Sequence, residues 1–115
     1  MKKINFIKLK EILYQEGYHI LLLSDSRINS MTTLTPHISR SRGLVHGLVM
    51  PDRNEIAINE NLSLKERVLT LVHELIHIAD KRYSEKVTEK LTHKLYKNFS
   101  DGELGFMEFA VSHDG

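Results

Sequence analysis

The chain has 115 residues, enough for one domain with a single core, and we expect one domain over residues 1–115. Its 16 Lys and Arg residues nearly balance its 15 Asp and Glu residues, so the composition gives no nucleic-acid signal. Hydrophobic residues make up 41% of the chain and charged residues 27%, proportions that are typical of folded globular proteins and exclude a disordered or fibrous class.

The sequence contains no cysteine, which excludes disulfides and Cys-ligated zinc. His, Asp and Glu are therefore the strong metal ligands that it offers. The longest apolar run near the start covers residues 20–23, far shorter than a signal-peptide core or a membrane span. We therefore expect a cytoplasmic protein with no membrane association.

The first 42 residues are expected to form a helix, a strand and a loop. Apolar residues recur at mostly helical spacing between lysines over residues 4–16, which predicts an amphipathic helix that ends at Gly17 and covers a sheet. The short apolar run at residues 18–23 predicts a strand. Residues 24–42 are rich in Ser, Thr and Arg and show no sustained period, so we expect a long loop, either mobile and functional or merely a solvated connection.

The middle of the chain predicts a hairpin followed by a buried helix. Two apolar runs within residues 43–59 flank a segment with turn chemistry, PDRN, which predicts a β-hairpin. Ser63 and Glu66 then form an S-x-x-E capping box, so a helix should begin at residue 64. Apolar residues surround nearly the whole circumference of residues 64–79, which indicates a buried helix.

The last third of the chain predicts one further helix. Ser84 is a second N-cap, and one apolar face continues from there to about residue 99. The two helices are thus joined by a tight turn. Residues 100–115 contain short apolar runs without a reliable period, so their structure stays open at this point.

The buried helix contains an HExxH motif made of His73, Glu74 and His77. Residues four apart return to the same helix face, so the two imidazoles converge and can bind one zinc ion. Glu74 follows the first ligand and would lie beside the metal, where it could act as general base. Zinc lowers the pKa of bound water from about 15.7 to about 7, so hydroxide would be available at neutral pH. An accidental match would point to solvent, but unpaired ionisable groups in an apolar helix cost several kcal/mol each. This context favours the zinc site.

A catalytic zinc needs a third protein ligand besides the two histidines. Glu85 follows His77 by eight residues and lies just beyond the turn, so a chain reversal would return it to the metal. Glu89 lies one turn later and would be either the ligand or a group that orients a histidine. For both glutamates, an ordinary solvated helix carboxylate is the alternative. The remaining competitors are Asp80, His93 and His113.

Tyr83 and Tyr96 also lie near the motif in the sequence. Either hydroxyl could donate a hydrogen bond to a tetrahedral intermediate, as an oxyanion stabiliser does. A tyrosine that packs between two helices is the simpler interpretation.

Residues 54–80, NEIAINENLSLKERVLTLVHELIHIAD, resemble the strand, loop and HExxH helix of the ImmA/IrrE metallopeptidases. Residues 84–96 are similar to the helix that follows in that family, where a glutamate serves as third ligand, and the resemblance places this role on Glu85 rather than Glu89. Thr88 and Thr92 stand where the family has small residues that let the helices approach closely. The family more often has alanines there and a longer gap before the ligand.

The resemblance also implies a biological setting. Many relatives pair with, or cleave, a transcriptional repressor encoded beside them on a phage or mobile element. Short relatives without a DNA-binding domain occur in phage genomes.

Together these features predict an α+β, zincin-like domain with a short sheet and hairpin packed on the motif helix. The expected activity is that of a gluzincin-like, zinc-dependent metallopeptidase acting on a protein or peptide substrate, with metal ligands His73, His77 and Glu85. An exposed hairpin edge lined by His46 and Gly47 could hold an extended peptide. The alternative is a catalytically weak metal-binding interaction module, which would need the histidines but not the base Glu74.

Overall fold

The structure is a computed structural model that describes residues 4–32, 38–41 and 44–112. In chain order the elements are α1 (Phe6–Tyr14), β1 (His19–Leu23), α2 (Asp25–Ser30), β2 (Ile38–Ser41), β3 (Leu44–Met50), the 3-10 turn η2 (Pro51–Arg53), β4 (Glu55–Asn59), α3 (Leu64–Ala79), α4 (Glu85–Asn98) and α5 (Asp101–Ala110).

The strands form one mixed sheet with the order β1-β4-β3-β2. β1 pairs with β4 in parallel, whereas β3 is antiparallel to both of its neighbours. The predicted hairpin is confirmed, since β3 and β4 are joined by η2 and by Asn54, whose φ of 52° closes the turn. The α+β class is confirmed as well. The zincin-like arrangement remains a prediction.

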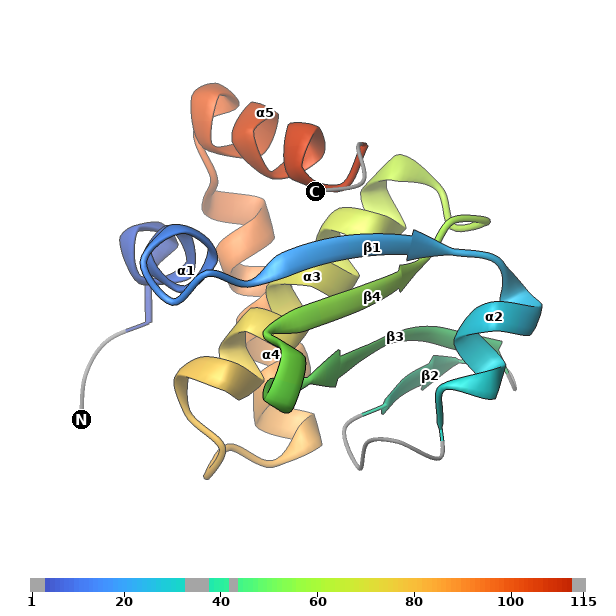
Figure 1. Cartoon of the computed structure of the whole chain (residues 1–115). Coiled ribbons are helices and arrows are strands. Elements are labelled where there is room, and N and C mark those ends of the chain that lie inside the picture. Colours follow the sequence, from blue (N-terminus) through green and yellow to red (C-terminus); the bar gives the residue numbers. More distant parts are fainter. Residues whose placement is uncertain (1–3, 33–37, 42–43, 113–115) are drawn as a thin grey trace.

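Helix α3 is the centre of the main core. Figure 1 shows it running behind the sheet, and it contacts strands β3 and β4 on one side and helices α1, α4 and α5 on the others. This surrounding explains why nearly every position from Val68 to His77 is buried, as the all-round apolar pattern predicts. The capping box of Ser63 and Glu66 is also present and fixes where the helix starts.

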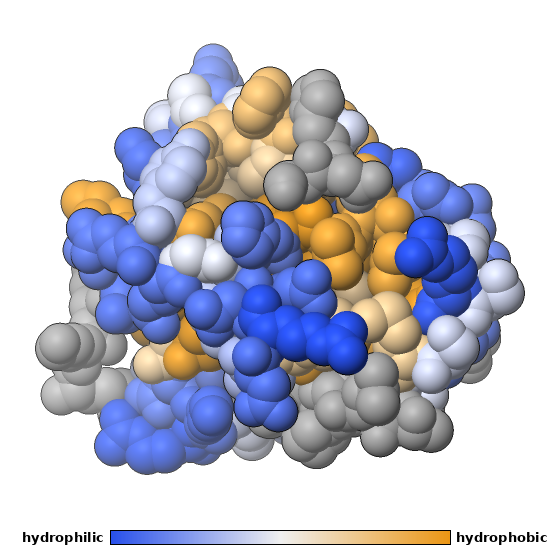
Figure 2. All heavy atoms as spheres, in the orientation of Figure 1, coloured by the Kyte–Doolittle hydropathy of each residue, from blue (hydrophilic) through white to orange (hydrophobic). Residues whose placement is uncertain are grey.

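The other face of the sheet carries a smaller apolar cluster. Ile28 of the short helix α2 packs there with Leu23, Val45 and Leu48 of the strands. Figure 2 shows an apolar area over this face, bordered by hydrophilic residues. The sheet is therefore apolar on both faces, with the HExxH motif of α3 behind one of them.

The expectation of an unstructured segment at residues 24–42 is wrong in its described part. Ser24 caps α2, and Asp25 accepts hydrogen bonds from the side chains of Asn59 and Asn61 at the end of β4. Further along, β2 forms the edge of the sheet beside β3. The partners of Asp25 lie 34 and 36 positions away, and α2 and β2 are too short to show a clear period in the sequence.

The open segment after residue 100 contains helix α5. Its start is fixed by a second capping box, in which Ser100 and Glu103 bond to each other's backbone N–H groups. The guanidinium of Arg67 donates to the carbonyl of Val111 and so ties the end of α5 to α3. Among the described residues, no helix has the length and apolar character required to span a membrane.

The hairpin edge expected to hold a peptide is not an edge in the structure. β3 lies between β4 and β2, and Gly47 pairs with Ser39 across the β2–β3 ladder. A register shift in that ladder falls at His46, because Arg40 pairs with Val45. His46 and Gly47 therefore lie next to a paired strand, β2, that the sequence did not indicate.

Gly47 instead permits the close packing of α3 on β3. A Cβ atom at this position would lie 2.6 Å from the Cγ2 of Thr70, 3.0 Å from the carbonyl oxygen of Ala57 and 3.9 Å from the Cγ of Glu74. The first distance is far inside van der Waals contact. Any side chain at residue 47 would therefore push away the part of α3 that carries the motif.

We expect Gly47→Ala to lower the free energy of unfolding by about 1–3 kcal/mol, because the added methyl group overpacks the helix–sheet contact. Urea denaturation followed by circular dichroism measures this. Gly105→Ala is the matched control, since a Cβ there meets nothing within 4 Å and alanine favours the helix by about 0.5–1 kcal/mol. Equal stability of the two variants would contradict the steric explanation.

Candidate metal centre

Helix α3 supplies three of the candidate site residues. His73, Glu74 and His77 lie in its buried C-terminal half and are 6%, 1% and 8% exposed. The two imidazole rings lie on one face of the helix, with their centroids 4.8 Å apart. The convergence predicted from the HExxH spacing is therefore present.

The turn between α3 and α4 is held by Asp80 and Arg82. The carboxylate of Asp80 accepts hydrogen bonds from the backbone N–H of Arg82 and, at 3.0 and 2.9 Å, from two nitrogens of its guanidinium. Ser84 then caps α4 by accepting from the N–H of Val87, so Glu85 is the first residue of the helix. This turn reverses the chain and returns Glu85 to the face of α3 that carries the histidines.

His73, His77 and Glu85 meet at one point, and we refer to them as the ligand trio. The two Nε2 atoms are 3.1 Å apart, Glu85 Oε2 lies 3.2 Å from His73 Nε2, and Glu85 Oε1 lies 2.7 Å from His77 Nε2. Tetrahedral zinc ligands at about 2.0–2.1 Å from the ion are separated from one another by about 3.3 Å. The spacing of the trio fits such an ion, and the group could hold a metal.

Glu89 occupies the outer side of the same site. Its Oε2 lies 3.1 Å from His73 Nδ1, the ring nitrogen that faces away from His77, and its Oε1 lies 3.0 Å from Nε2 of His93. A carboxylate beside Nδ1 favours a proton on that nitrogen, which leaves the lone pair of His73 Nε2 directed at the trio. This position beside His73 Nδ1 is the one expected for the orienting role considered for Glu89.

Helix α4 approaches α3 closely because its facing residues are small. Thr88 and Thr92 are its buried residues, 0% and 1% exposed. The close approach expected from the two threonines is therefore found. A larger side chain at either position would move Glu85 away from the two histidines.

The other candidate ligands are not part of the trio. Asp80 is engaged by Arg82, and His93 contacts Glu89 on the exposed surface of α4. His113 lies outside the described residues. Tyr83 and Tyr96 are both partly buried against the core, which agrees with a packing role.

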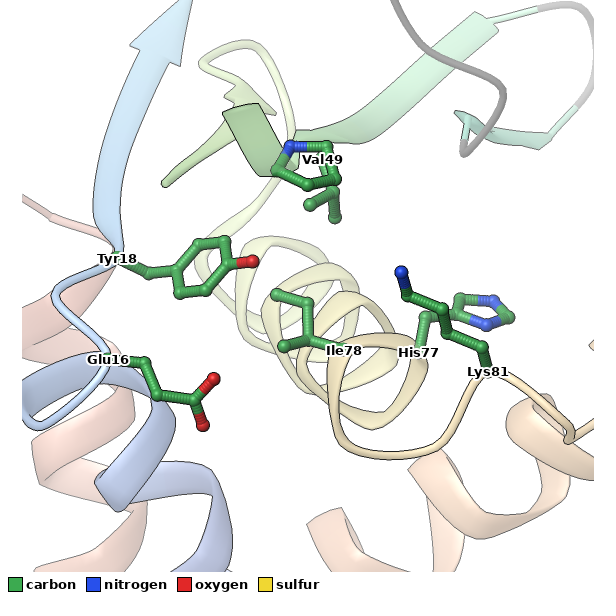
Figure 3. A pocket seen from close by; sticks show the side chains of 7 residues that line it. Glu16, Tyr18, Val49, His77, Ile78 and Lys81 are labelled. Carbon is green, nitrogen blue, oxygen red and sulfur yellow. The ribbon is translucent and has the colours of Figure 1, made fainter. Parts of the chain in front are cut away.

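A cavity adjoins the site at the C-terminal end of α3. His77 forms part of its wall, together with residues from the α1–β1 connection and the end of β3 (Figure 3). Sequence reasoning did not indicate these lining residues, because they come from segments that are far apart in the chain. The contact of His93 with Glu89 was missed as well, although their i, i+4 spacing is a usable signal.

Comparisons with family models, curated proteins and solved structures find no match to this chain. The resemblance to the ImmA/IrrE metallopeptidases therefore stays a prediction from the motif and its flanking residues. The candidate site stands on its geometry.

The turn gives an expected pH dependence. The hydrogen bonds from Arg82, followed by its positive charge, lower the pKa of Asp80 from 3.8 to about 2. A carboxyl group with a lowered folded-state pKa stabilises the folded protein above its unfolded value, and this contribution is lost as pH falls from about 4 through about 2. The turn therefore keeps its ion pair throughout the neutral range.

We expect Arg82→Gln to raise the pKa of Asp80 back toward 3.8, since the guanidinium supplies the main lowering interactions. An NMR titration of the side-chain carboxyl carbon measures the midpoint in both proteins. Lys81→Gln is the control, because it removes a neighbouring positive charge that has no hydrogen bond to Asp80 among the described residues. An unchanged midpoint in Arg82→Gln would contradict this account of the turn.

We expect Glu89→Gln to weaken Zn²⁺ binding about tenfold, because the carboxylate that orients His73 loses its charge while its shape is retained. Competition with a chromogenic chelator measures the affinity. Glu108→Gln on α5 is the matched control and should bind Zn²⁺ as the unmodified protein does. Equal affinities for all three proteins would show that Glu89 does not position the histidine.

Proposed function

We propose that the protein is a zinc-dependent peptidase in which His73, His77 and Glu85 hold the metal and Glu74 is the general base. The observation that carries the proposal is the spacing of the ligand trio, two imidazole nitrogens and a carboxylate gathered from two helices. Two histidines with one glutamate are a ligand set of catalytic zinc, which leaves a fourth position for water or substrate. Sites for calcium and magnesium use oxygen ligands instead, so the two imidazoles favour zinc.

The burial of Glu74 supports its role as base. It directly follows His73 in α3 and is 1% exposed, and its Cγ lies near Gly47 of the central strand β3. A carboxylate enclosed in this way is shielded from bulk water, and Glu74 directly follows a member of the trio in the helix. Glu74 would accept a proton from the attacking water and pass it to the leaving amine. A zinc ion bound at the trio would supply Lewis-acid chemistry, which polarises the substrate carbonyl and makes hydroxide accessible near neutral pH.

Glu74→Gln is the experiment that tests the proposal. We expect zinc content and thermal stability to stay near those of the unmodified protein, while hydrolysis of a casein or quenched-peptide substrate falls by about 10²–10⁴-fold, the usual contribution of a general base. Metal content is measured by elemental analysis of the same preparations. His73→Ala, His77→Ala and Glu85→Ala should each lose zinc as well as activity.

The outcomes separate the proposal from the alternative of a metal-bound interaction module. A module needs the trio for its metal but has no use for a base, so its biological activity would survive Glu74→Gln. Zinc bound at one equivalent with no hydrolysis by the unmodified protein would overturn the peptidase proposal. Zinc content that is unaffected by the three ligand substitutions would overturn the metal centre itself.

A further inference from the structure

The cavity beside the ligand trio has the size of a single side chain. Its volume is about 200 Å³, whereas sites for drug-sized ligands measure about 300–1,000 Å³. His77 belongs both to the trio and to the cavity wall. Whatever enters the cavity therefore lies next to the metal centre.

The walls suit a long aliphatic stem. Val49, Pro51 and Ile78 line the cavity, and Figure 3 shows open space between Val49 and Ile78. These residues come from the end of β3, the following turn and α3, all of which belong to the framework of the sheet and its central helix. The apolar middle of the cavity is therefore preformed.

The end of the cavity remote from His77 offers negative charge. Figure 3 shows the hydroxyl group of Tyr18 directed into the cavity, with the carboxylate of Glu16 on the same side and His77 on the opposite side of Ile78. Among the described residues, the carboxylate of Glu16 makes no ion pair. The backbone carbonyl of Glu16 accepts a hydrogen bond from the side chain of Asn54, which fixes the α1–β1 connection beside the sheet.

The pKa of Tyr18 reflects burial and also the negative charge of Glu16. Burial, and after it the negative charge of Glu16, raises the pKa of the Tyr18 hydroxyl above 10.0. The hydroxyl therefore stays protonated at neutral pH and can share a cationic group with the carboxylate. One anionic and one neutral acceptor thus lie on the side of the cavity remote from His77.

We propose that this cavity is a specificity subsite for a lysine or arginine side chain of the substrate residue that adjoins the scissile bond. The stem of such a side chain would lie along Val49 and Ile78, and its cationic head would reach Glu16 and Tyr18. The assignment to a substrate residue rests on the proposed peptidase function. The binding of a cationic side chain by the cavity does not.

Lys81 affects the orientation in which a cationic side chain would enter the cavity. It lies beside His77 at the other end of the cavity, and it makes no ion pair among the described residues (Figure 3). Its ammonium group repels a cationic head from the end near the metal, while Glu16 attracts it at the far end. The charge gradient along the cavity therefore favours a cation at the Glu16 end and disfavours one beside the trio.

The test uses two blocked alanine tripeptides, one with arginine at its centre and one with citrulline, which has the same shape without the charge. Their binding to the Glu74→Gln protein is followed by NMR shifts of the backbone amides of Tyr18, Val49 and Ile78, with and without Zn²⁺. We expect the arginine peptide to bind roughly threefold to tenfold more tightly. This preference should disappear in an added Glu16→Gln substitution.

Two control substitutions make the result specific. Glu11→Gln removes the same charge five residues earlier, in α1 and outside the cavity lining, and should leave the preference intact. Lys81→Gln should preserve or increase it. Equal binding of the two peptides, shifts outside the cavity, or a preference that survives Glu16→Gln would overturn the proposal.

Cleavage of a peptide library by the zinc-loaded, unmodified protein then separates the two proposals. Cuts beside lysine and arginine that become unselective in Glu16→Gln support the subsite. Cuts without any such preference overturn the assignment to the scissile bond. Arginine binding in the cavity without hydrolysis of any peptide would overturn the peptidase function and leave the cationic binding site standing.

Discussion

The burial of His73, Glu74 and His77 in an otherwise apolar helix is the constraint on which the rest of the structure depends. An ionisable side chain in such surroundings loses hydration at a cost of several kcal/mol unless polar partners replace the water. Helix α4 brings those partners to the two histidines, since Glu85 meets both imidazoles immediately after a short turn. The ion pair in that turn and the cap at Ser84 are the local devices that make the return possible.

The polar contacts also govern how α4 is attached. Its buried residues are the two small threonines Thr88 and Thr92, and its apolar residues Leu91 and Leu95 are only partly buried. The contacts of its first two turns with His73 therefore add to a partly buried apolar contact. A metal bound at the trio would link the position of α4 to the metal, contributing about 2.7 kcal/mol at a free concentration 100 times the dissociation constant.

The sequence was most informative about elements whose spacing, caps and turn residues all lie within one short segment. The motif helix, its capping box and the hairpin could be predicted because their spacing, caps and turn residues are local, and Glu85 follows from the chain reversal after His77. Helix α2 and strand β2 could not, because six and four residues are too short for a period. Helix α5 was predictable in part, since Ser100 and Glu103 repeat the capping signal that marks α3.

The cavity shows why recognition is harder to predict from sequence than chemistry. The candidate reactive groups come from one motif and the next helix, whereas Glu16 and Tyr18 belong to a segment almost sixty residues earlier that has no motif. The parallel pairing of β1 with β4, begun by the bond from the N–H of His19 to the carbonyl of Asn54, sets that segment beside the end of α3. Substitutions there can therefore change what the cavity accepts without disturbing the geometry of the trio.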